Sequence, residues 1–145
     1  MRSLRAVVGL SLCSAWILAF GAPHDSNCEE PDKSFKGFLS KFAEDRKFQI
    51  ERSIFPLVAR FGPPDVAPPT IELWGAGTVQ DFKTPIILSR TERRKMGLEQ
   101  EILFATDRVA EVFHFKPEAD SYRIRFLFRS YRGCWYLEQF HDTAL

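Results

Sequence analysis

Residues 122–130 read Tyr-Arg-Ile-Arg-Phe-Leu-Phe-Arg-Ser, and this stretch decides the class of the fold. Its two sets of side chains alternate: Tyr122, Ile124, Phe126 and Phe128 are apolar, and between them stand Arg123, Arg125, Leu127 and Arg129. Successive side chains of a strand point to opposite faces of the sheet, so alternation is the signature of a half-buried strand. The pattern predicts a strand with an apolar inner face and a basic outer face.

Three further strands are predicted around it, at residues 101–106, 108–116 and 134–141. Residues 116–120 (Lys-Pro-Glu-Ala-Asp) and 131–133 (Tyr-Arg-Gly) contain the residue types that turns require. Links this short join antiparallel neighbours. The last third of the chain is therefore predicted to be an antiparallel meander.

Helical spacing appears before the meander. Ser34 is a suitable N-cap for a helix whose apolar face repeats at i, i+3, i+4 and i+7, through Phe35, Phe38, Leu39 and Phe42. From Phe48 onward the pattern fits a second helix or an extended segment, and Pro56 would end a helix near residues 53–54. A short strand at 71–74 and a charged helix that begins at Ser89 or Thr91 and ends at Gly97 follow. Helices early and strands late indicate an α+β fold.

The domain organisation follows from composition. Arg2 and Arg5 precede an uncharged apolar run at residues 6–20, and Ala19 and Gly21 suit signal-peptidase cleavage before Ala22. The run is short for an uncleaved membrane anchor, which is the alternative. We therefore predict a signal peptide at 1–21, a flexible leader at 22–33 and one domain at 34–145 with a proline-rich loop at 62–69. The mature protein would be periplasmic or secreted, without stable insertion in a membrane.

Two cysteines remain after cleavage, Cys28 and Cys134. An even number of cysteines in an exported protein favours a disulfide over two unrelated buried thiols. Neither cysteine has a His or Cys at ligand spacing, so no metal site is predicted. The 20 basic and 19 acidic side chains nearly cancel, which argues against a nucleic-acid partner.

Residues 35–57 carry the series F-x-x-F-x-x-x-F-x-x-D-x-x-F-Q-x-x-R-x-x-F-P-L, and Trp135-Tyr136-Leu137 stand near the end of the chain. This combination resembles an uncharacterised family of exported bacterial proteins, known best from gut anaerobes and described as a domain of unknown function. The resemblance implies an architecture similar to nuclear transport factor two, in which helices pack on a strongly curved antiparallel sheet and form a cone. The family brings no established catalytic residues.

A polar strip runs through the aromatic residues of this series. Asp45, Gln49 and Arg52 are candidates for ligand binding, with Arg52 as the residue whose planar guanidinium suits a carboxylate. The alternative is a hydrogen-bonded network that anchors the following loop, because polar groups near a core must be paired.

The basic face of the 122–130 strand is a candidate interaction surface, through Arg123, Arg125 and Arg129. An acidic protein surface or an anionic envelope polymer would suit it. The alternative is the ordinary solvated face of a sheet.

The sequence contains no nucleophile motif, glycine-rich phosphate loop or sign of a cofactor. A histidine and a carboxylate could meet inside the cone if the strands pair suitably, from Glu111, His114, Glu138, His141 and Asp142. We expect an exported, non-catalytic binding module for an unknown small molecule or envelope protein. The alternatives are a periplasmic immunity or inhibitor protein and a small enzyme with a His–carboxylate pair.

Overall fold

The computed structural model describes Cys28, residues 30–63 and residues 68–144. The predicted signal peptide at 1–21, most of the leader before Cys28 and residues 64–67 of the proline-rich loop lie outside the described residues. The signal peptide and its cleavage before Ala22 therefore stay predictions.

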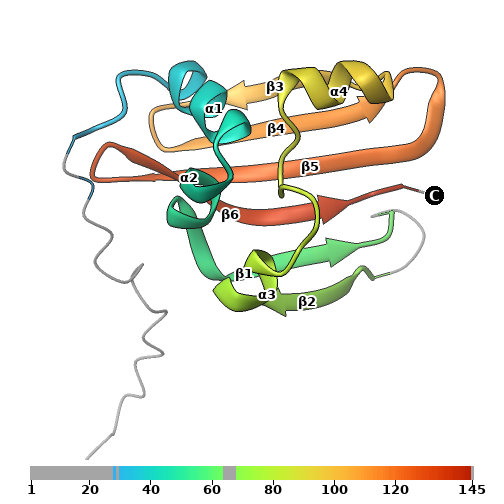
Figure 1. Ribbon diagram of the computed structural model, residues 1–145, viewed down its shortest axis with the longest axis horizontal. Helices are drawn as coiled ribbons and strands as arrows, with labels where there is room; N and C mark the ends of the chain where they lie inside the picture. Colours follow the sequence, from blue (N-terminus) through green and yellow to red (C-terminus); the bar gives the residue numbers. More distant parts are fainter. Residues whose placement is uncertain (1–27, 29, 64–67, 145) are drawn as a thin grey trace, which may run out of the picture.

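Within the described residues, four helices lie on one face of a six-stranded sheet whose strand order is β2-β1-β6-β5-β4-β3 (Figure 1). This arrangement confirms the α+β class, with helices packed on a curved sheet. The helices are α1 (Phe35–Glu44), α2 (Arg46–Glu51), α3 (Ala76–Gln80) and α4 (Arg90–Met96). The strands are β1 (Ser53–Phe61), β2 (Thr70–Trp74), β3 (Glu99–Ala105), β4 (Val109–Lys116), β5 (Ala119–Tyr131) and β6 (Cys134–Asp142).

Strands β3 to β6 form the predicted antiparallel meander. The sheet as a whole is mixed, because β6 also pairs with β1 in the parallel direction, with Ala59 opposite Phe140. This pairing joins segments some eighty residues apart and leaves no local trace in the sequence. The ambiguous stretch after Phe48 contains both expected elements, since α2 ends at Glu51 and β1 begins at Ser53.

Local signals set the ends of the helices. The Ser34 side chain accepts a hydrogen bond from the Gly37 N–H at the start of α1. At α4, Ser89 and Glu92 form a reciprocal capping box, and Gly97 ends the helix in the left-handed conformation at φ 66°. Both predicted caps are therefore confirmed, with Ser89 rather than Thr91 as the cap of α4.

Phenylalanine rings fill the space between α1, α2 and the inner face of the sheet. Phe42 is fully buried, and its ring centroid lies 5.3 Å from that of Phe38, 6.5 Å from that of Phe48 and 5.4 Å from that of Phe128. Aromatic pairs at this spacing add favourable edge-to-face contacts to the burial of apolar surface. A second group of inner rings covers the β1–β2 end of the sheet and comprises Phe61, Trp74, Phe82 and Phe140. The interior of the cone is thus a packed core.

No helix among the described residues is long and apolar enough to cross a bilayer.

We expect Phe42→Ala to lower the free energy of unfolding by about 3–5 kcal/mol, because the change opens a cavity among rings that have little freedom to collapse. Phe104→Ala is the matched control, since Phe104 is 43% exposed on β3 and its truncation opens no cavity. Urea denaturation of both variants measures the difference. Equal losses in the two variants would contradict this account of the core.

Candidate binding surfaces

Two of the three predicted ligand residues are Asp45 and Gln49. Both side chains form hydrogen bonds with backbone groups. Asp45 lies between α1 and α2, and its carboxylate accepts a hydrogen bond from the Phe48 N–H at 3.0 Å. Gln49 is 1% exposed; its amide donates to the Ile87 carbonyl and accepts from the Ile86 N–H, both at 2.9 Å. Gln49 thereby fixes the segment between α3 and α4 against α2, a segment more than thirty residues further along the chain and not the following loop named in the alternative interpretation.

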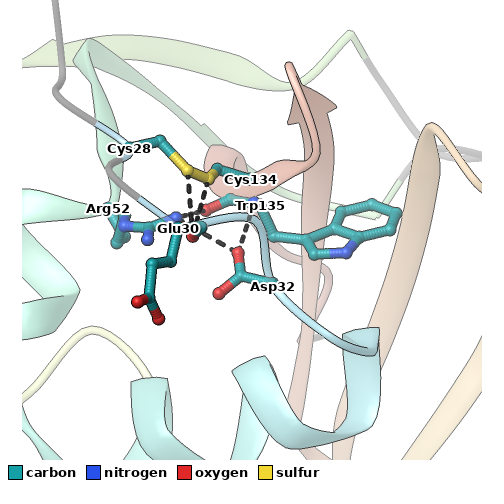
Figure 2. Close-up of a disulfide and its surroundings, with 6 residues drawn as sticks. All are labelled: Cys28, Glu30, Asp32, Arg52, Cys134 and Trp135. Atoms are coloured by element: carbon teal, nitrogen blue, oxygen red, sulfur yellow. Dashed lines mark hydrogen bonds and ion pairs between the residues drawn. A yellow bond between two sulfur atoms is a disulfide. The ribbon is translucent and has the colours of Figure 1, made fainter.

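Arg52, the third residue, forms an ion pair with Asp32 at 3.1 Å, and both side chains are largely buried. Its guanidinium also lies over the rings of Phe48 and Tyr136, 5.1 and 5.3 Å from their centroids. Figure 2 shows the Asp32 carboxylate and the Arg52 guanidinium converging on the backbone of Trp135. Asp32 accepts from the Trp135 N–H at 2.8 Å. Sequence reasoning missed Asp32 because nothing in the polar leader distinguishes it.

The disulfide between Cys28 and Cys134 is confirmed (Figure 2). It attaches the leader to the first residue of β6, and the Asp32 N–H reinforces the attachment by donating to the Gly133 carbonyl at 2.9 Å. The described end of the leader is therefore held at three points: the disulfide, the Asp32 backbone and the Asp32–Arg52 ion pair.

A groove of about 610 Å³ lies beside this attachment, between the leader and helices α1 and α2. Arg52 lines it, but the guanidinium is already paired with Asp32, and Glu51 on the same rim forms an ion pair with Lys47 at 3.6 Å. Lys41 also lines the groove and places its ammonium 4.2 Å from the Phe48 centroid. The groove is thus amphipathic, and its Asp32, Arg52 and Glu51 side chains are paired within the chain.

The outer face of the sheet is the face opposite the helices, and two rows of residues cross all six strands on it. The strand register sets these rows: Ile71, Arg60, His141, Arg125, Phe113 and Glu101 in one, and Leu73, Val58, Gln139, Leu127, Glu111 and Phe104 in the other. None of the described residues covers this face with a helix or a further sheet (Figure 1).

Each of the three predicted surface arginines has a carboxylate partner. The pairs are Arg123–Asp120 at 2.9 Å, Arg125–Glu111 at 3.2 Å and Arg129–Glu138 at 2.9 Å. The guanidinium groups of Arg123 and Arg125 also lie 5.5 Å from the centroid of the Phe113 ring. Phe113 stacks on Phe115, with centroids 4.9 Å apart and planes inclined by 17°. Aromatic residues and arginines share this face, and its positive charge is largely neutralised.

The histidines and carboxylates considered for catalysis form no pair in the described part of the chain, although the register places His114 and Asp142 on the inner face and His141 and Glu111 on the outer face. His114 is fully buried on the inner face, where its Nε2 lies 2.9 Å from Gln100 Oε1. Glu111 and Glu138 are bound to arginines on the outer face. His141 contacts the Gly62 carbonyl at 3.2 Å. In the described part of the chain neither histidine is hydrogen-bonded to a carboxylate.

Burial, together with a smaller effect of the nearby Arg93 charge, lowers the pKa of His114 to about 3. The ring is therefore neutral at ordinary pH. Nε2 faces the Gln100 oxygen, which can only accept a hydrogen bond, so the neutral ring carries its proton on Nε2 and donates to that oxygen. Nδ1 is then a hydrogen-bond acceptor. Among the described residues Nδ1 has no hydrogen-bond partner. No group of three His, Cys, Asp or Glu side chains in this part of the chain is placed to hold a metal ion.

Comparison with solved structures identifies the architecture. The chain is similar to an NTF2-like protein from Bacteroides fragilis, with a TM-score of 0.55 and 18% identity over 80% of this chain and 50% of that one. This chain has an NTF2-like fold. It spans about half the length of the Bacteroides protein.

Two other solved structures are similar to parts of the NTF2-like domain. One is a de novo designed protein with a curved β-sheet (TM-score 0.43, 13% identity, 74% of this chain and 90% of that one). The other is a domain of unknown function with a cystatin-like fold from Nostoc punctiforme (TM-score 0.39, 12% identity, 79% of each chain). No family model and no curated protein matches the sequence.

We expect Gln49→Leu to lower the free energy of unfolding by about 2–3 kcal/mol, because it leaves the Ile86 N–H and the Ile87 carbonyl without partners in the interior. Asp45→Asn is the control: asparagine caps helices as well as aspartate, so stability should change little. Chemical denaturation measures both. A Gln49→Leu protein as stable as the wild type would contradict the anchoring role.

Stability should also depend on pH through His114. The folded-state pKa is lower than the unfolded value of 6.5, so the unfolded chain binds a proton that the folded chain excludes. The stabilisation is complete above about pH 6.5 and is lost as the pH falls toward 3. We expect the wild type to lose about 1 kcal/mol between about pH 7 and pH 5.5, and His114→Gln to lose less. Equal slopes in urea titrations of the two proteins would contradict this expectation.

Proposed function

We propose that this protein is an exported, non-catalytic binding module that recognises a protein partner through the outer face of its sheet. The observation that carries the proposal is the Phe113–Phe115 stack with two arginines over Phe113 on a face that no described element covers. Arginine and aromatic residues are the types enriched where protein interfaces concentrate their binding energy.

The packed interior supports a surface role over a ligand enclosed in the cone. Phe42, Phe126 and Phe128 are fully buried and occupy the space that a ligand inside the cone would need. The small-enzyme alternative loses support for the same reason, together with the separation of His114 from the carboxylates Glu111 and Glu138. A binding function therefore fits the described residues better than acid–base catalysis.

The charges of the outer face favour a particular kind of partner. Because Arg123, Arg125 and Arg129 are each compensated by a carboxylate, the face offers little net attraction to an anionic envelope polymer. Exposed ion pairs contribute only about 0–1 kcal/mol each, so a partner can rearrange them at little cost. A protein surface with an apolar centre and charges of both signs is the best match.

Export is supported by the N-terminal sequence pattern and by the disulfide, which is typical of oxidising compartments. A periplasmic or secreted protein of this kind would meet its partner in the envelope or outside the cell. An immunity or inhibitor protein is a narrower form of the same proposal, in which the partner is a toxin or an enzyme whose active surface the outer face blocks.

Photo-crosslinking in the producing cell tests the proposal. A benzophenone amino acid in place of Phe113 should yield one discrete protein adduct, because Phe113 belongs to the aromatic and arginine cluster of the outer face. The control replaces Lys47 on α2, whose side chain is 86% exposed on the helical side, and should yield no such adduct. Combining the Phe113 probe with Arg125→Glu should weaken the adduct.

Absence of an adduct from position 113, or the same adduct from position 47, would contradict recognition through the outer face. Arg94→Glu on α4 is the matched charge reversal outside this face and should leave the Phe113 adduct unchanged. Mass spectrometry of the adduct then identifies the partner, and a toxin or enzyme would favour the immunity or inhibitor form.

A further inference from the structure

A second, smaller pocket of about 270 Å³ opens between α1, α4 and the edge strand β3, away from the groove beside the disulfide. In Figure 1, α4 lies over the β3 side of the sheet, next to α1. The polar groups that line the pocket come from all three elements and are Lys36, Ser40, Glu44, Arg90, Arg93 and Gln100.

The charges of this pocket are not balanced. Three cations, Lys36, Arg90 and Arg93, line it with a single carboxylate, that of Glu44. None of the ion pairs formed by the described residues includes any of these four side chains. The Glu44 carboxylate is directed instead to the backbone, where it accepts a hydrogen bond from the Arg90 N–H at 3.2 Å.

Arg93 is the most informative of the three cations. It is half-buried, and burial lowers the pKa of its guanidinium, an effect that the charge of Glu44 opposes in part. One nitrogen of the guanidinium donates to the Leu88 carbonyl at 2.7 Å, which fixes its position, and none of the carboxylates in the described part of the chain forms an ion pair with it. The half-buried cation is compensated only in part by the more distant Glu44, and a bound anion would complete the compensation.

Gln100 offers an oriented donor at the same pocket. Its Oε1 accepts from the neutral His114 ring, so the orientation of the amide is fixed from behind. The Gln100 NH₂ group has two N–H donors, and neither has a partner among the described residues. Buried His114 therefore acts as a positioning residue that leaves the Gln100 donors free for a ligand.

We propose that this pocket binds a small anion bearing a phosphate or carboxylate group. Arg93 and Lys36 provide the charge, and the Gln100 amide provides a neutral donor. The volume, below the usual range of about 300–1,000 Å³ for drug-sized ligands, limits the occupant to a compact molecule. The site is independent of the outer face, because its walls are the helices on the opposite side of the sheet.

An NMR titration of the purified ¹⁵N-labelled protein tests this site, with inorganic phosphate and malonate as separate probes at ionic strength held constant with NaCl. Each probe that binds should produce saturable shifts of the Arg90, Arg93 and Gln100 amides. Arg93→Gln should weaken the affinity about tenfold, the effect of losing one charged hydrogen-bond partner. Lys36→Gln should weaken it in the same direction without touching the interior.

Arg94→Gln is the matched control, because Arg94 is the exposed neighbour of Arg93 on α4 and does not line the pocket. Its affinity should equal that of the wild type. If only phosphate saturates the shifts, the anionic group of the ligand is a phosphoryl group. If only malonate does so, it is a carboxylate. The proposal is overturned if neither probe saturates, or if Arg94→Gln weakens binding as much as Lys36→Gln does, since the attraction would then be nonspecific.

Discussion

The packing of phenylalanine rings between α1, α2 and the inner face of the sheet is the constraint on which the rest of the structure depends. Phe38, Phe42 and Phe128 bring the helices onto the sheet and fill the space between them with packed rings. Both proposed binding sites lie outside this core. The same packing accounts for many of the 14 phenylalanines of this short chain.

Charge compensation distinguishes the three surfaces. The groove beside the disulfide and the outer face both contain arginines, but Asp32 and Glu111 neutralise Arg52 and Arg125 within the chain. Around Arg93 the compensation is incomplete, and this contrast, rather than the number of basic residues, marks the small pocket as an anion site. If volume alone decided, the groove beside the disulfide would be the better candidate for a binding site. Its Asp32–Arg52 ion pair instead holds the leader in place.

Sequence periodicity and capping residues predicted most of the fold, because those signals are local. Ser34 and Gly97 mark helix ends, and alternation along β5 assigned its two faces correctly. The parallel pairing of β1 with β6 was inaccessible, since no local pattern encodes which distant strand is the neighbour. Partners of polar side chains were equally hidden: the sequence allowed Gln49 either a ligand or a place in an internal hydrogen-bonded network, and it gave no sign that the partners would be Ile86 and Ile87.

The central position of β6 has a consequence for the order in which the protein can be assembled. Strand β6 lies between β1 and β5, so the β1–β2 hairpin and the β3–β5 meander share no strand pairing until β6 is in place. A ribosome, or a channel that delivers the chain N-terminus first, therefore releases two unconnected halves of a sheet. Contacts between distant segments form slowly. Cys28 cannot form its disulfide until Cys134 has been synthesised. Because Cys134 is the first residue of β6, the disulfide can form only once synthesis has reached the strand that joins the two halves of the sheet.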